Sequence, residues 1–208
     1  MKKSQAYKSL VKQINASGSD KLNGYSTDLL DNIYEDEREE VENLIWSAFF
    51  DRKDIDIAVL FPGLKTRDGI HALKNVVNNY SVPSEASMLI AFIIYNNTRE
   101  NAYLKLMERN IVESNYNYSY ISLLICAPLR EEVYEVLAGI YKKCSERVAC
   151  GSVINGILYQ KGYIKDINNI KEVLGMKELR KVLKNVTREQ RDDMLKKFET
   201  GEFESYKI

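Results

Sequence analysis

Apolar side chains recur at helical spacing along most of this chain. In the first segment they stand at positions i, i+3, i+4 and i+7, namely Tyr7, Leu10, Val11 and Ile14. This stripe predicts an amphipathic helix over residues 4–16. The run from Met88 to Tyr95 is apolar on every side, and in a soluble protein such a run predicts a helix that is covered on both faces. The pattern as a whole predicts an all-α fold.

Turn and capping residues divide the chain into further helices. Breaks are expected at residues 16–19 and 23–24, where Ser, Gly and Asn gather. A restart that contains Pro83 precedes a helix beginning near Glu85. The spacing of Thr187 and Gln190 is that of a capping box before the last helix. The other predicted helices lie at about 26–33, 36–50, 55–64, 68–79, 99–113, 120–127, 131–144, 148–159, 167–174 and 178–186.

An Arg-acid dipeptide recurs with a period near 30 residues. Its four copies are Arg38-Glu39, Arg67-Asp68, Arg99-Glu100 and Arg130-Glu131, at spacings of 29, 32 and 31 residues. An apolar residue follows at the same offset in each copy, namely Val41, Ile70, Ala102 and Val133. Of these, Val41, Ala102 and Val133 are expected in the core. The next positions hold Glu42, His71, Tyr103 and Tyr134. Such a period predicts tandem helical hairpins.

The repeats resemble HEAT-like and armadillo-type α-helical repeats over residues 35–160. Residues Lys65 to Leu73 are similar to the loop and second-helix start of a short HEAT unit. The resemblance implies one domain over residues 1–208, a right-handed α-α superhelix with an N-terminal helix and C-terminal capping helices. Such solenoids bind partners on a concave face formed by their second helices. By this analogy Glu42, His71, Tyr103 and Tyr134 would line a groove.

The charges balance overall but are unevenly distributed. The chain has 30 Lys and Arg against 30 Asp and Glu, so no net field attracts it to nucleic acid or a membrane. Residues 1–60 carry 8 basic and 12 acidic side chains, whereas residues 161–199 carry 11 basic and 7 acidic ones. We therefore expect an acidic end and a basic end. The longest apolar run has eight residues, too few to span a bilayer, and no secretory signal is evident.

The sequence contains no recognised catalytic or cofactor motif. It lacks the glycine-rich nucleotide-binding patterns and the nucleophile elbow of hydrolases. Its one histidine, His71, has no zinc-site spacing around it. We therefore expect no enzyme activity, no cofactor and no metal. The three cysteines form no CxxC pair, and we expect reduced, mostly buried thiols in a cytoplasmic protein.

Three groups of polar residues are open to both a binding and a structural interpretation. Eight acids stand between Asp28 and Glu42, and they either meet a basic partner or form a solvated helix start. The four repeat arginines either offer fork donors to an anion or pair with acids of the adjoining repeat. Tyrosines of the middle repeats serve either an interface or the core: Tyr95, Tyr103, Tyr116, Tyr118, Tyr120 and Tyr134.

In its small size, acidic end and many Tyr and Asn residues, the chain is similar to immunity proteins of bacterial polymorphic toxin systems. This resemblance implies a protein partner, a toxin domain, held by Glu39, Glu40, Glu42, His71, Tyr103 and Tyr134. The alternatives are a HEAT-like DNA-binding or DNA-repair protein and an adaptor in a cellular complex. Zero net charge argues against nucleic acid, and no membrane partner is expected.

Overall fold

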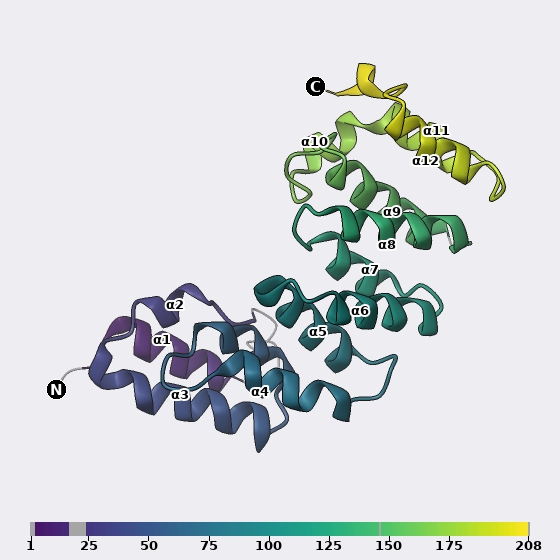
Figure 1. Ribbon diagram of the computed structural model, residues 1–208. Helices are drawn as coiled ribbons and strands as arrows, with labels where there is room; N and C mark the ends of the chain where they lie inside the picture. Colours follow the sequence, from purple (N-terminus) through teal and green to yellow (C-terminus); the bar gives the residue numbers. More distant parts are fainter. Residues whose placement is uncertain (1–2, 17–23, 146, 208) are drawn as a thin grey trace. The chain divides into compact units, whose positions relative to one another are not determined.

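The computed structural model describes residues 3–16, 24–145 and 147–207 (Figure 1). Every regular element within these ranges is helical, which confirms the predicted all-α class. The predicted breaks at 16–19 and 23–24 fall largely outside the described residues. The elements are α1 (Gln5–Ile14), α2 (Asp28–Asp31), α3 (Glu35–Phe50), η2 (Ile55–Gly63), α4 (Gly69–Val76), η3 (Val77–Asn79), α5 (Glu85–Thr98), α6 (Asn101–Glu113), α7 (Tyr118–Ile125), α8 (Glu131–Lys143), α9 (Arg147–Gln160), α10 (Ile170–Gly175), α11 (Lys177–Lys184), α12 (Arg191–Glu199) and η4 (Glu204–Tyr206).

The chain divides into two compact units. The N-terminal unit comprises Met1–Ser81 and Leu89–Arg99, and the C-terminal unit comprises Val82–Met88 and Glu100–Ile208. Residues of α5 belong to both. Each unit has its own buried apolar residues, and we describe each by itself. The single repeat domain expected over residues 1–208 stays a prediction.

An aromatic cluster between α3 and η2 forms part of the interior of the N-terminal unit. The ring centroids of Phe49 and Phe61 lie 4.8 Å apart, and those of Trp46 and Phe61 lie 5.7 Å apart. The segment predicted as an α-helix over 55–64 is a 3₁₀ helix that contains Pro62. Proline has no backbone N–H and its ring crowds the preceding turn, which explains why an α-helix does not continue there.

The Arg-acid dipeptides stand at three helix starts but not at the fourth. Asp68, Glu100 and Arg130 are the N-cap residues of α4, α6 and α8, whereas Arg38 lies inside α3. The N-cap is the second residue of the dipeptide in α4 and α6 but the first in α8. The buried position is therefore constant when it is counted from the helix start, not from the dipeptide. The fourth residue of each helix is buried: Ala72, Leu104 and Tyr134.

The expectation of a buried Ala102 is accordingly wrong, since this residue is exposed while Leu104 is 3% exposed. The apolar face of α6 begins two residues later than the dipeptide spacing predicts. The period of about 30 residues therefore marks helix starts better than it marks core side chains.

Three helices pack closely in the middle of the C-terminal unit. A Cβ atom placed on Gly156 of α9 would lie 2.5 Å from Cγ2 of Ile125 in α7 and 3.1 Å from Cδ1 of Leu137 in α8. The absence of a side chain at Gly156 thus allows α9 to approach both neighbours. α11 is joined to α8 by the Tyr141 hydroxyl, which donates a 2.5 Å hydrogen bond to the carbonyl of Leu183.

One of the two hydrogen bonds of the predicted capping box is present ahead of α12, but the N-cap residue of this helix is Gln190 and not Thr187. The side-chain carbonyl of Gln190 accepts a 3.0 Å hydrogen bond from the backbone N–H of Thr187. A turn covers residues 188–190, and α12 itself begins at Arg191.

Two of the three cysteines are buried, as expected, but these two are not the reduced thiols that the sequence predicts. Cys144 and Cys150 form a disulfide with their Cα atoms 6.0 Å apart, and Cys126 is exposed. The two are six residues apart, with Cys144 at the end of α8 and Cys150 in the first turn of α9. No sequence motif such as CxxC predicts that these two cysteines pair.

Candidate functional site

Glu42 is the most buried acid of the predicted acidic surface. Its carboxylate accepts hydrogen bonds from the backbone N–H groups of Lys65, at 2.8 Å, and Thr66, at 2.9 Å, and from the Thr66 hydroxyl. Arg38 donates to it at 3.4 Å. Burial raises the pKa of Glu42, but these hydrogen bonds outweigh burial and hold the pKa below its ordinary value. Glu42 therefore anchors the loop before α4, and its carboxylate is not offered to a partner.

The other acids of α3 are divided between structural contacts and solvent. The buried Glu37 accepts hydrogen bonds of 2.6 Å from the backbone N–H and from the hydroxyl of Ser4. Glu40 is exposed and pairs with Lys3 and the Tyr7 hydroxyl, both at 2.5 Å. Glu39 is exposed and forms no ion pair with another described residue. Three of the eight acids, Glu37, Glu40 and Glu42, thus attach the start of α1 and the 65–66 loop to α3.

The remaining predicted partner-binding residues are dispersed. His71 is exposed on α4 in the N-terminal unit. Tyr103 is half-buried on α6 and Tyr134 is 6% exposed on α8, both in the C-terminal unit. Lys161 Nζ lies 3.6 Å from the ring centroid of Tyr134. Burial, with Glu199 and Glu131 nearby, raises the pKa of Tyr134 to about 12, so this phenol remains neutral. A groove shared by these residues stays a prediction.

The repeat arginines contact their own surroundings. Arg38 is 2% exposed and donates a 2.7 Å hydrogen bond to the carbonyl of Leu30. Arg67 donates to Asn43, and its guanidinium lies 4.8 Å from the ring centroid of Trp46. Both contacts are structural, but neither is the predicted pairing with an acid of the adjoining repeat: Arg38 pairs with Glu42 of its own helix, and Arg67 contacts an amide and a ring.

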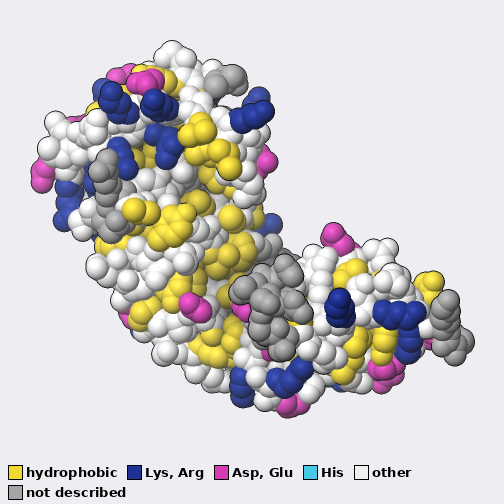
Figure 2. Space-filling model, turned by 180° about the vertical axis from the view of Figure 1, so that it is seen from behind, with side chains coloured by type: hydrophobic (Ala, Val, Ile, Leu, Met, Phe, Trp, Pro, Cys, Tyr) yellow, Lys and Arg dark blue, Asp and Glu magenta, His cyan; other side chains and the backbone are white. Residues whose placement is uncertain are grey.

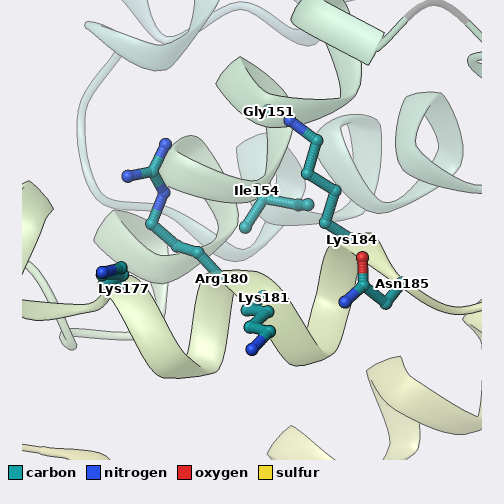
Figure 3. Close-up of a pocket in the computed structure, with 7 residues that line it drawn as sticks. All are labelled: Gly151, Ile154, Lys177, Arg180, Lys181, Lys184 and Asn185. Atoms are coloured by element: carbon teal, nitrogen blue, oxygen red, sulfur yellow. The ribbon is translucent and has the colours of Figure 1, made fainter.

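A basic groove lies along α11 and was not identified from the sequence as a site. The side chains of α11 at positions i, i+3, i+4 and i+7 line a cavity of about 350 Å³ with α9: Lys177, Arg180, Lys181 and Lys184. Asn185, Gly151 and Ile154 complete its wall. In Figure 3, Arg180 and Lys184 extend from α11 toward α9 on either side of Ile154. We call these seven residues the basic groove.

The amphipathic character of α11 explains why the cations gather. Leu179 and Leu183, at i and i+4, are buried on one side of the helix, so the positions opposite them face outward. Among the described residues none of the four cations forms an ion pair. Figure 2 shows Lys and Arg side chains over the C-terminal helices. Four unpaired positive charges at one cavity create a local field that attracts anions.

A second cavity of about 250 Å³ adjoins the basic groove and shares Lys184 and Asn185 with it. Arg191, which also lines this cavity, donates hydrogen bonds to the carbonyls of Tyr141, at 2.5 Å, and Cys144, at 2.7 Å. Its buried Nε–H has no hydrogen-bond acceptor among the residues that the structure describes. The positive region thus continues from α11 toward the start of α9.

A third cavity, of about 270 Å³, lies between α6 and α8 and is mixed in charge. It is lined by Asn101, Leu104, Lys105, Glu108, Glu132, Glu135 and Val136. Arg130 Nε already pairs with Glu132 at 2.8 Å. The mixture of one cation, three acids and apolar groups favours no single class of ligand.

Within the described ranges, no three His, Cys, Asp or Glu side chains are grouped to hold a metal ion. The same ranges contain no helix with the length and apolarity needed to cross a membrane. No protein-family model, no curated protein and no solved structure matches this chain. The basic groove is therefore assessed on its own chemistry.

Proposed function

We propose that this chain is a non-catalytic protein-binding module and that it binds an acidic segment of its partner along the basic groove. The observation that carries the proposal is the stripe Lys177, Arg180, Lys181 and Lys184, four cations with no ion pair among the described residues at one cavity. Complementary charge across an interface speeds association and excludes partners of the wrong sign. An acidic segment fits this requirement.

The surroundings of the groove favour a protein over a nucleic acid. The stripe runs over the eight residues of α11, a rise of about 10 Å at 1.5 Å per residue, which is short for tracking a phosphate backbone. The buried side chain of Ile154 contributes an apolar wall. Exposed apolar side chains stand close by in sequence, with Ile170 and Leu174 on α10 and Val182 on α11. Protein interfaces combine such apolar contacts with charged ones.

The narrower form of the proposal is an immunity protein, or antitoxin, that occupies a toxin domain. In that form the partner would present acidic residues to the basic groove, and the exposed Glu39 on α3 would have a secondary role. The architectural part of the proposal is a right-handed, HEAT-like superhelix. Its support is the recurrence of helix starts at Gly69, Asn101 and Glu131, 32 and 30 residues apart.

A binding assay with two labelled probes tests the proposal. The probes are a glutamate-rich peptide and a DNA duplex, measured by fluorescence anisotropy against the full chain at fixed salt. We expect the peptide to bind more tightly than the duplex. A variant with Lys177, Arg180, Lys181 and Lys184 all changed to Gln should lose at least tenfold in peptide affinity. Tighter binding of the duplex would overturn the proposal in favour of a nucleic-acid function.

Two matched variants control this assay. Lys171 is an exposed cation on α10 outside the groove, and Lys171→Gln should bind the peptide as the wild type does. Charge reversal of Glu39 and Glu40 distinguishes the two charged surfaces. If the acidic surface of α3 were the binding site, co-expression with the neighbouring open reading frames would yield a complex that this reversal weakens and the groove variant leaves intact.

A further inference from the structure

The centre of the basic groove has two different cations arranged about an apolar residue. Arg180 is half-buried and Lys184 is exposed, and both border the same cavity with Ile154. They lie one helical turn apart, at i and i+4, and extend toward α9 in Figure 3. A planar guanidinium offers a fork of N–H donors, whereas an ammonium acts as a compact point charge.

Gly151 leaves space at this point. It lies in the second turn of α9, and a helical glycine costs roughly 0.5–1 kcal/mol relative to alanine. A Cβ atom built on Gly151 would lie 3.8 Å from Lys184 Nζ, at ordinary contact distance, with no other heavy atom within 4 Å. The position therefore tolerates a methyl group, and a longer side chain would enter the cavity beside the Lys184 ammonium.

These features match a compact group with two negative charges. A carboxylate brings one charge and two oxygens, which one arginine fork satisfies. A phosphate monoester brings between −1.5 and −2 charges at pH 7 and three acceptor oxygens. It can therefore accept the Arg180 fork with two oxygens and the Lys184 ammonium with the third. A cavity of about 350 Å³ has room for this group.

We propose that the cavity between α9 and α11 is a phosphate-monoester site, in which Arg180 and Lys184 hold the phosphoryl oxygens over Ile154. This inference deepens the proposed function and rests on it: the acidic segment of the partner would carry a phosphorylated side chain. The shared chemistry is the phosphate monoester. Its two sources are a phosphorylated protein segment and a small phosphorylated molecule.

Isothermal titration of the full chain tests the inference with four probes. They are the glutamate-rich peptide, the same peptide with one phosphoserine, free phosphoserine and acetate. We expect the phosphopeptide to bind at least tenfold more tightly than the unphosphorylated peptide, and acetate to give no saturable signal. Equal affinity for the two peptides would overturn the phosphate site while leaving the proposed function standing.

The remaining outcomes separate the two sources and the two proposals. Free phosphoserine binding as tightly as the phosphopeptide would support the site but overturn a protein source. If free phosphoserine binds this tightly and the unphosphorylated peptide does not bind at all, the phosphate site stands and the proposed protein-binding function is overturned.

Substitutions locate the site within the groove. Arg180→Gln with Lys184→Gln should abolish the preference for the phosphopeptide, and Lys171→Gln should keep it. Gly151→Gln keeps every charge but fills the cavity, so it should lower phosphopeptide affinity at least tenfold, whereas Gly151→Ala should lower it less. Far-ultraviolet circular dichroism confirms that each variant is folded. An unchanged preference in folded Gly151→Gln and in the double variant would overturn the inference.

Discussion

The carboxylate of Glu42 accepts a 2.8 Å hydrogen bond from the backbone N–H of Lys65, 23 residues further along the chain. Glu42 is fully buried, so this contact, with those from Thr66 and Arg38, holds the loop that precedes α4 against α3. A residue that belongs by sequence to an acidic surface is thus part of the interior of the N-terminal unit.

Removing the charge of Glu42 should destabilise the fold. Glu42→Gln removes the buried carboxylate partner of the Arg38 guanidinium and places an amide N–H₂ against backbone N–H donors. Breaking a buried ion pair costs about 3 kcal/mol or more. We expect a loss of about 3 kcal/mol in the free energy of unfolding by urea. The control is Glu39→Gln, an exposed position, which should change it by less than about 0.5 kcal/mol.

Stability should fall in acid through Glu37 and Glu42. The pKa of each is held below the ordinary value of 4.5. A carboxyl group whose pKa is lower in the folded state contributes stability above the pKa of the unfolded chain, and this contribution is lost as the pH falls through the folded pKa. The stability difference between wild type and Glu42→Gln should therefore be constant near pH 7 and shrink below pH 4.5. Urea titrations at a series of pH values measure it, and a difference that grows in acid would contradict the assignment.

Two helical glycines of the C-terminal unit should respond oppositely to alanine. Gly156→Ala places a methyl group 2.5 Å from Ile125 Cγ2, and overpacking of this kind costs about 1–3 kcal/mol. Gly139→Ala in α8 meets no heavy atom within 4 Å, so the better helix propensity of alanine should stabilise the unit by about 0.5–1 kcal/mol. Thermal unfolding followed by circular dichroism distinguishes the two. Similar effects of both substitutions would show that α7, α8 and α9 pack less closely than described.

The disulfide between Cys144 and Cys150 should stabilise the C-terminal unit. It closes a short loop, for which the chain-entropy relation gives about 2 kcal/mol. Treatment with a dithiol, or the double substitution of Cys144 and Cys150 by Ser, should lower the free energy of unfolding by up to this amount. Cys126→Ser removes the exposed thiol and should leave it unchanged. Equal stability with and without dithiol, together with three titratable thiols in the native protein, would argue that the bond does not form.

The helices could be predicted from the sequence because their signals are local. The stripe of Leu10 and Ile14, the apolar run to Tyr95 and the pairing of Thr187 with Gln190 depend on residues within one or two turns of each other. Hydrophobic spacing and capping act over that range. The charge imbalance between the two ends of the chain was likewise readable from composition.

The candidate site depended on contacts between distant segments. The acids of α3 look alike in sequence, but packing against Ser4 and Thr66 buries Glu37 and Glu42 and leaves Glu39 exposed. The four cations of α11 have an ordinary helical spacing, and they become a site only where α11 lies beside Gly151 and Ile154 of α9. Local sequence determines which residues share a helix face. Tertiary packing decides which of those faces lose water and which keep unpaired charge, because desolvation depends on the neighbouring segment.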